Sequence, residues 1–170
     1  MPETKNAYTL AELLGDVNDD TRRREFNTGE PVGREVVEYA DEQLKQDTLE
    51  FDLLNIRNAL KLAEAGIGLV SPNPLVGCVI AAPNGDIVGE GTYTYDGLIH
   101  AEAIALEQAG ENARGGTAYV SLEPHSHHGK TPPCTDALVN AGIMRVVCPI
   151  EDPNPLVSGR GFETLRKAGV

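Results

Sequence analysis

Apolar residues follow a helical period in one part of the chain and form short continuous runs in another. Between residues 48 and 65 the apolar side chains recur every three or four positions, at Leu49, Leu53, Ile56, Leu60 and Ala63. This period predicts a helix, which ends at the glycines that follow it. Two apolar runs, 76–82 and 87–94, are joined by Asn84-Gly85, a pair typical of a hairpin turn. We therefore expect a helix followed by a β-hairpin.

After the hairpin, helical and strand patterns take turns. Helices are predicted at 100–108, at 135–140 and near 161–167, and strands at 118–122 and 145–148. A helix, a hairpin and then repeated helix–strand units are typical of an α/β protein with a mixed sheet flanked by helices.

The first 46 residues differ from the rest. They are dense in charge, carry an arginine-rich cluster at 22–25 and contain a Gly-Glu-Pro-Val-Gly break at 29–33. We interpret residues 1–46 as an N-terminal extension and residues 47–170 as the domain. Within the extension, helical patches are plausible at 9–14 and 34–44. Disorder, or packing on a partner subunit, remains open.

Composition limits the classes of function. A chain of 170 residues with 41% hydrophobic content suits one domain with an appendage. Its net charge of −12 argues against binding nucleic acid through the phosphate backbone, although a local cation could hold a small anion. No run approaches the roughly 18 apolar residues of a membrane span, and the first residues lack the features of a signal peptide. We expect a cytoplasmic protein without membrane contact.

The three cysteines fall into two groups. Cys78 and Cys148 lie inside the apolar runs LVGCVIA and RVVCPI, so we expect both to be buried and chemically inert. Cys134 differs, because it follows Pro132 and Pro133 and opens a predicted helix. It is the cysteine that we expect to take part in chemistry.

Candidate reactive residues lie at the starts of two predicted helices. His100 and Glu102 begin one helix and Cys134 begins the next, with a histidine-rich loop, 123–131, between them. The positive end of a helix dipole favours a carboxylate at Glu102 and a thiolate at Cys134. Two such ends that converge on one point would form a site that stabilises anions.

A His-x-Glu sequence followed by a Pro-Cys pair is typical of zinc deaminases. Four strings carry a more specific likeness: SPNPLVGCVI, HAEAIAL, YVSLEPHSHHGKTPPCTDALVNAGI and EDPNPLVSGRG. In this order they resemble the deaminase domain of the bifunctional riboflavin-biosynthesis deaminase/reductase, from about residue 49 to residue 170. The resemblance implies a three-layer fold of the cytidine deaminase type. It also implies a zinc ion bound by His100, His125 and Cys134, with Glu102 as the catalytic proton shuttle.

His125 departs from the family, which usually has cysteine at this position. Imidazole is an ordinary zinc ligand, so the site remains chemically sound. With one thiolate fewer, the donor set is one charge less negative, and we hypothesise that the zinc becomes a stronger Lewis acid. A decayed site is the alternative, but His100, Glu102 and Cys134 are all retained. The neighbouring histidines, 127 and 128, remain possible ligands.

The resemblance also implies a substrate and its contacts. The substrate would be a phosphorylated pyrimidine, 2,5-diamino-6-(5-phosphoribosylamino)pyrimidin-4(3H)-one, with Asn73 at the base and Lys130 near the phosphate. The prolines on either side of Asn73 are expected to keep its backbone extended. From the residues alone, Pro-Asn-Pro is a rigid turn and Lys130 a solvent-facing charge. Tyr93 stands where the family often has histidine.

Partners and alternatives complete the expectations. The bifunctional relatives continue into a reductase domain that this sequence lacks, so a separate reductase is a candidate partner. A sheet edge left unpaired predicts a homo-oligomer. Two other functions stay open: a zinc deaminase of another nucleoside, nucleotide or base, and a catalytically silent metal-binding scaffold that uses residues 1–46 as its contact surface.

Overall fold

The computed structural model describes residues 34–93, 99–127, 131–155 and 157–170, with the backbone alone for residues 34–41. Its elements in chain order are α2 (Arg34–Glu64), β1 (Gly77–Ala81), β2 (Ile87–Thr92), α3 (Ala101–Ala109), the 3-10 helix η3 (Gly110–Ala113), β3 (Thr117–Val120), α4 (Cys134–Asn140), β4 (Arg145–Val147) and α5 (Arg160–Ala168). Within these residues no helix is both long and apolar enough to cross a membrane.

The four strands form one mixed sheet in the order β2-β1-β3-β4. β1 is antiparallel to both of its neighbours, whereas β3 and β4 run parallel. The hairpin between β1 and β2 turns at Asn84 and Gly85, where the amide of Gly85 donates to the carbonyl of Ala82 at 2.9 Å and φ is +90°. The hairpin that the Asn-Gly pair predicts is therefore confirmed.

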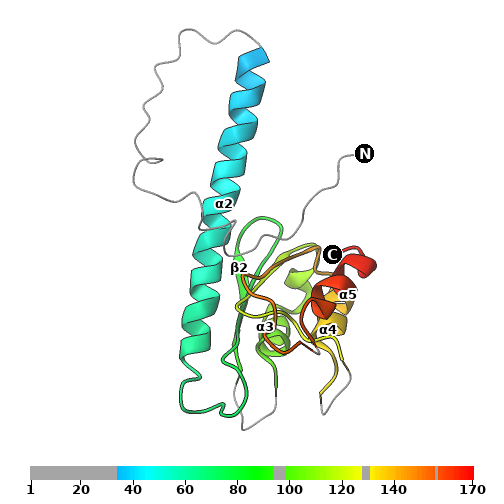
Figure 1. Cartoon of the computed structure of the whole chain (residues 1–170). Helices are drawn as coiled ribbons and strands as arrows, with labels where there is room; N and C mark the ends of the chain where they lie inside the picture. Colours follow the sequence, from blue (N-terminus) through cyan, green and yellow to red (C-terminus); the bar gives the residue numbers. More distant parts are fainter. Residues whose placement is uncertain (1–33, 94–98, 128–130, 156) are drawn as a thin grey trace.

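Helices cover both faces of the sheet (Figure 1), so the molecule has three layers. On one face, α2 packs against alternate residues of β1, β3 and β4, and the core there is apolar: Leu53, Ile56, Ala59, Val79, Ala81, Tyr119 and Val147. On the other face, α3 and α4 cover the remaining strand residues, among them Cys78, Ile80, Ala118, Val120 and Val146. Successive side chains of a strand point to opposite faces of the sheet, so the same strands supply core residues to both faces.

One buried ionic network connects α2 to the sheet. Asp52 is 1% exposed, and its Oδ1 accepts hydrogen bonds from the hydroxyl of Tyr119 at 2.9 Å and from Arg145 at 2.8 Å. Arg145 also pairs with Oδ2 of the same carboxylate. Because a buried carboxylate needs such partners, the network fixes the position of α2 over β3 and β4.

Two glycines let α3 lie directly on β2. A Cβ atom added at Gly91 would come within 2.0 Å of the carbonyl oxygen of Ala101, and one added at Gly89 within 2.1 Å of that of Ala105. Side chains at either position would push α3 away from the sheet. The start of α3, which carries Glu102, is held in place by this close contact.

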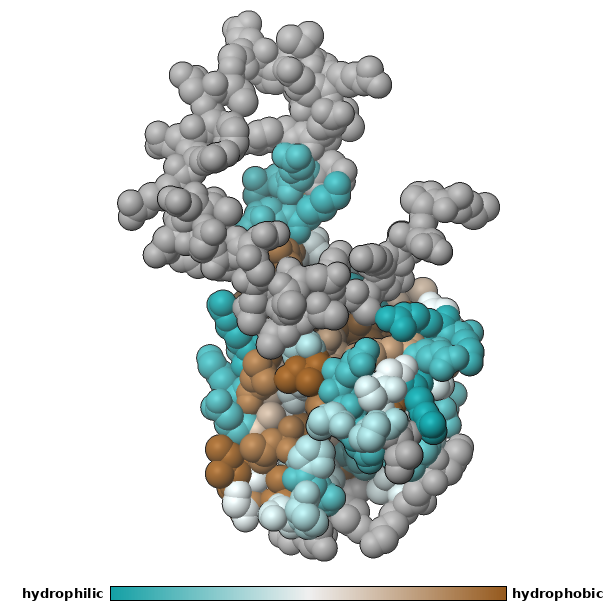
Figure 2. All heavy atoms as spheres, viewed as in Figure 1, coloured by the Kyte–Doolittle hydropathy of each residue, from teal (hydrophilic) through white to brown (hydrophobic). Residues whose placement is uncertain are grey.

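The predicted elements are present within one or two residues, with one correction at the N-terminal side. The two helices expected at 34–44 and 48–65 are a single helix, α2, which runs without a break through residues 46 and 47. Residues 42–48 are all exposed, and this stretch extends beyond the sheet (Figure 1) with a mainly hydrophilic surface (Figure 2). Bonds between positions i and i+4, such as Gln43 to Asp47, support it. The helix expected at 9–14 lies outside the described residues, and the domain boundary stays a prediction.

Candidate active site

The starts of α3 and α4 and the loop after β3 meet at one end of the sheet. His100 is the residue before α3, in an extended conformation with φ −71° and ψ 151°, and Glu102 lies in the first turn. Cys134 is the first residue of α4. His125 lies in the loop after β3, and its carbonyl accepts a hydrogen bond from the amide of Thr135 at 3.3 Å. The structure thus brings together the residues that the two motifs predict.

The potential ligand atoms of His100, His125 and Cys134 all lie within 4.8 Å of one another. The Nδ1 atom of His125 is 3.1 Å from the Sγ atom of Cys134. The imidazole rings of His100 and His125 stack with a centroid distance of 4.4 Å and an interplanar angle of 26°. Cys134 is buried and the two histidines are partly buried. Among the described residues, this is the group of His, Cys, Asp and Glu side chains whose arrangement could hold a metal ion.

Glu102 is a buried carboxyl group beside this group. It is 2% exposed, and it lies close enough to the thiol of Cys134 for each group to affect the pKa of the other. Its Oε2 atom is buried and has no protein partner among the described residues. Burial is the main reason why the pKa of Glu102 is raised above its ordinary value. A buried oxygen without a partner is available to a ligand of the site.

Burial controls the charge of the three possible ligands. It lowers the pKa of His100, and it lowers that of His125 to about 4 with help from the positive charges of His100 and His127, so both imidazoles are neutral at pH 7. Burial, followed by the carboxylate of Glu102, raises the pKa of Cys134 above its ordinary value. The expectation that the helix end favours a thiolate here is wrong for the metal-free chain, because loss of solvation outweighs the dipole.

These features fit a zinc ion. Neutral imidazole and thiolate are the preferred ligands of zinc, and catalytic zinc sites use three protein ligands. The thiol of Cys134 is buried next to a carboxylate, so it needs a neighbouring cation to ionise. The unpartnered Oε2 of Glu102 lies where a further polar molecule would be held. His100, His125 and Cys134 are the residues that could hold the ion.

Two other histidine contacts help to define the group. The Nε2 atom of His100 lies 3.0 Å from the hydroxyl oxygen of Thr131, a contact that no spacing in the sequence indicates. His127 is exposed, and its ring meets that of His125 edge-on at 5.3 Å. It is not part of the ligand group in the described residues. His128, the other histidine left open, lies outside them.

The sequence interpretation missed a buried carboxylate that anchors the loop of His125. Glu123 is 6% exposed and accepts three backbone hydrogen bonds, from Gly161 at 2.7 Å, Gly159 at 2.9 Å and Asp152 at 3.0 Å. It therefore ties the end of β3 to the start of α5. A Cβ atom at Gly161 would come within 2.1 Å of the carbonyl of Pro124, so α5 also packs tightly against the residue before His125.

The two predicted substrate contacts have different outcomes. Asn73 has an exposed side chain, and its amide nitrogen donates to the hydroxyl of Tyr93 at 2.9 Å. Its backbone is not part of a straight extended segment as expected: the chain bends at Asn73, whose N–H donates to the carbonyl of Val70 at 2.8 Å and closes a turn over residues 70–73. Lys130 lies outside the described residues, and its contact with a phosphate stays a prediction.

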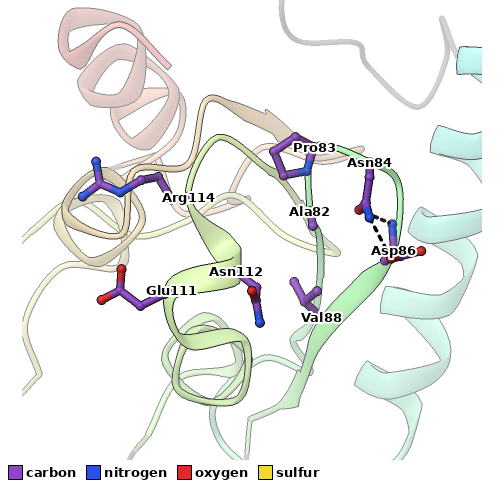
Figure 3. Close-up of a pocket in the computed structure, with 8 residues that line it drawn as sticks. All are labelled: Ala82, Pro83, Asn84, Asp86, Val88, Glu111, Asn112 and Arg114. Atoms are coloured by element: carbon purple, nitrogen blue, oxygen red, sulfur yellow. Dashed lines mark hydrogen bonds between the residues drawn. The ribbon is translucent and has the colours of Figure 1, made fainter.

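A hollow of about 520 Å³ lies beside the β1–β2 turn (Figure 3), at the end of the sheet opposite the candidate active site. It is open, and its lining combines the β1–β2 turn with η3: Ala82, Pro83, Asn84, Asp86, Val88, Glu111, Asn112 and Arg114. Asn84 and Asp86 bond to each other across the turn. None of the predicted site residues lines it.

Comparisons with known proteins agree with this geometry. The model of the family described as the cytidine and deoxycytidylate deaminase zinc-binding region matches residues 50–150. The chain is 58% identical to the riboflavin biosynthesis protein RibD of Escherichia coli over 112 residues, which are 66% of this chain and 30% of RibD. It is 49% identical over 126 residues to the riboflavin biosynthesis protein PYRD of Arabidopsis thaliana, covering 74% of this chain and 29% of PYRD.

Solved structures show the same relationship. RibD of Acinetobacter baumannii superposes with a TM-score of 0.69 at 48% identity, over 71% of this chain and 34% of that protein. The deaminase/reductase of Thermotoga maritima superposes with a TM-score of 0.66 at 47% identity, over 71% of this chain and 35% of that protein. The resemblance and the three-layer fold expected from the sequence strings are therefore confirmed. The chain spans about a third of the length of these relatives.

Proposed function

Because the chain belongs to the cytidine and deoxycytidylate deaminase zinc-binding family, we propose that it deaminates a phosphorylated diaminopyrimidinone of riboflavin biosynthesis. The substrate would be 2,5-diamino-6-(5-phosphoribosylamino)pyrimidin-4(3H)-one and the products ammonia and 5-amino-6-(5-phosphoribosylamino)uracil. One observation carries the proposal: a buried carboxylate with an unpartnered oxygen, Glu102, lies beside the group of His100, His125 and Cys134. The Thermotoga maritima relative is a diaminohydroxyphosphoribosylaminopyrimidine deaminase/5-amino-6-(5-phosphoribosylamino)uracil reductase.

The ligand set defines the cofactor of the proposal. His100, His125 and Cys134 would hold one zinc ion. When bound, it would act as a Lewis acid that makes water nucleophilic near neutral pH. The Nδ1 to Sγ distance of 3.1 Å and the 4.8 Å limit on the whole group support this ligand set, because the candidate ligand atoms already lie close together.

Glu102 would move the protons. Burial raises its pKa, so its carboxyl group can both accept and release a proton at a pH nearer to neutral than an exposed glutamate could. It would take a proton from the attacking water and pass it to the ring nitrogen, and then assist the transfer that releases ammonia. Water supplies the oxygen of the new carbonyl group, and the exocyclic amine leaves with the added protons.

Asn73 and Lys130 would hold the two ends of the substrate. The amide of Asn73 has its nitrogen bonded to Tyr93, which leaves the oxygen to accept from the base. Lys130 would meet the phosphate, because a chain with a net charge of −12 needs a local cation to bind an anion.

Incubation of the zinc-loaded protein with the diaminopyrimidinone ribotide tests this function. Ammonia release is measured in parallel on a panel of free pyrimidine bases, nucleosides and nucleotides, and Glu102→Gln serves as the inactive control. Release from the ribotide alone is the expected result. Release from another pyrimidine would assign a different substrate, and no release from any member would favour the silent scaffold.

The proposal also includes partners. We expect a homo-oligomer and a separate reductase that consumes the product. Sedimentation at micromolar concentration checks the first point, and a monodisperse monomer would contradict it. A coupled assay with an independent reductase, in which the product is consumed, checks the second.

A further inference from the structure

The side chains of Tyr93 and Asn73 are joined across a separation of 20 residues. Tyr93 directly follows β2, and its ring belongs to the core beneath α3, with only 6% of the residue exposed. Asn73 lies in the turn before β1 and is exposed. Its Nδ2 atom donates to the hydroxyl oxygen of Tyr93 at 2.9 Å. An exposed amide is therefore held by a buried phenol.

Tyr93 is held rigidly beside the candidate active site, so it can orient a side chain that bonds to its hydroxyl. Its amide donates to the carbonyl of Val76 at 3.0 Å, which pins its backbone to the start of β1. Its ring centroid lies 5.5 Å from that of His100 at a tilt of 49°. The side chain of Tyr93 thus contacts a potential metal ligand through its ring and Asn73 through its hydroxyl. A buried tyrosine has little rotamer freedom, so the hydroxyl does not move.

We propose that Tyr93 is a positioning residue that sets the specificity of the site by orienting the amide of Asn73. This inference rests on the proposed function. The nitrogen and oxygen of the amide are opposite ends of one planar group, so tying Nδ2 to Tyr93 turns Oδ1 away from Tyr93. A substrate at Asn73 therefore meets a hydrogen-bond acceptor.

Such an acceptor distinguishes two classes of pyrimidine. In a 2-aminopyrimidin-4(3H)-one, the carbon that loses its amine lies between a bare ring nitrogen, to which Glu102 would pass its proton, and a ring N–H group. In cytosine, the corresponding carbon lies between a bare ring nitrogen and a C–H group. An acceptor at Oδ1 can pair with the N–H group of the first ring but meets only a C–H group in the second, and an unpaired polar group in a binding site lowers affinity. The Tyr93 hydroxyl would favour aminopyrimidinones over cytosine compounds.

A double-mutant cycle tests the inference with zinc-loaded wild type, Tyr93→Phe, Asn73→Ala and the double variant. For the diaminopyrimidinone ribotide we expect Tyr93→Phe to raise KM about two- to tenfold, the value of one hydrogen bond, with little change in kcat. The inhibition constant of cytidine 5′-phosphate is expected not to rise. The double variant should match Asn73→Ala alone, because Tyr93 acts through Asn73. Additive effects, or a parallel rise of KM and the inhibition constant, would overturn the inference.

Tyr119→Phe is the matched control. It removes the hydroxyl of another buried tyrosine, which bonds to Asp52 on the opposite face of the sheet. We expect it to lower the free energy of unfolding and to leave KM unchanged. Zinc content, measured by elemental analysis, should be the same in all variants.

A readout on the free protein separates this inference from the proposed function. If the wild type releases no ammonia from the ribotide, the proposed function fails, and the orientation of Asn73 is decided by nuclear magnetic resonance. The side-chain amide signals of Asn73, identified by their loss in Asn73→Ala, should shift in Tyr93→Phe and stay in place in Tyr119→Phe. Signals that are identical in Tyr93→Phe and wild type would overturn the inference.

Discussion

The Nδ1 atom of His125 lies 3.1 Å from the Sγ atom of Cys134, so the second ligand of the proposed zinc site would be an imidazole, where the resemblance stated from the sequence implies a thiolate. Burial keeps the pKa of this imidazole at about 4, which makes it a neutral donor over most of the pH range. The donor set of His100, His125 and Cys134 therefore carries a single negative charge when a metal is bound. The ligand types, and not only their positions, set the chemistry of this site.

A change of His125 to cysteine tests the effect of that charge. His125→Cys should keep zinc and move the acidic limb of the pH profile of kcat/KM to higher pH, because a second thiolate weakens the Lewis acidity of the ion. The measurement is kcat/KM over the acidic range together with zinc content. An acidic limb that stays in place would reject the hypothesis.

Glu102 should make the metal-free protein sensitive to pH. Burial raises the pKa of its carboxyl group, so its contribution to stability is complete below the ordinary value of 4.5 and is lost as pH rises through the raised pKa. Metal-free Glu102→Gln is therefore expected to be more stable than the wild type at neutral pH, with a difference that disappears at acid pH. Urea unfolding at a series of pH values measures this.

Glu163 offers the control for that experiment. It is exposed and pairs with Lys167 one turn along α5 at 2.6 Å, an arrangement that contributes little to stability. Glu163→Gln should leave the pH dependence of unfolding nearly unchanged. If metal-free Glu102→Gln were no more stable than wild type at neutral pH, ionisation of the buried Glu102 would not be what destabilises the metal-free protein.

The contact between β2 and α3 predicts a second stability effect. Gly91→Ala places a Cβ atom 2.0 Å from the carbonyl of Ala101, which should push the start of α3 outward. We expect a loss of about 1–3 kcal/mol in the free energy of unfolding and weaker zinc binding. Glu90→Ala, at an exposed position of the same strand, is the control and should change neither. Unchanged zinc affinity in Gly91→Ala would show that the packing of α3 on β2 does not position the zinc ligands.

Glu123 predicts a loss at the loop of His125. Glu123→Gln keeps the shape of the side chain, but an amide cannot accept all three backbone hydrogen bonds that the carboxylate accepts. We expect a loss on the order of 2 kcal/mol in unfolding free energy. The rate at which a chelator removes zinc should also rise. A variant with wild-type zinc dissociation would show that Glu123 supports the fold alone.

Local sequence patterns were sufficient to predict most of the fold. Apolar runs predict the strands, and Asn84-Gly85 predicts the hairpin because only a few residue pairs suit its backbone. The helix before the hairpin was placed correctly at its end but not at its start. Residues 42–48, where the two predicted helices are joined, are exposed, so no buried apolar period continues through residues 45–47 to indicate one unbroken helix.

Long-range contacts at the site could not be predicted in this way. The motifs identify His100, Glu102 and Cys134, but Glu123 reads only as part of a loop, and its three partners are 29 to 38 residues away. The bond between Asn73 and Tyr93 likewise joins two distant segments. The pKa of Cys134 was misjudged because a helix start is visible in the sequence, whereas burial next to Glu102 is not.

The most direct test of the account is the metal itself, measured by elemental analysis and X-ray absorption on purified wild type, Cys134→Ser and His127→Ala. The account predicts about one zinc ion per chain in the wild type and in His127→Ala, with one sulfur among its ligands, and a marked loss of zinc in Cys134→Ser. A wild-type protein that binds no zinc, or a zinc ion without a sulfur ligand, would contradict it.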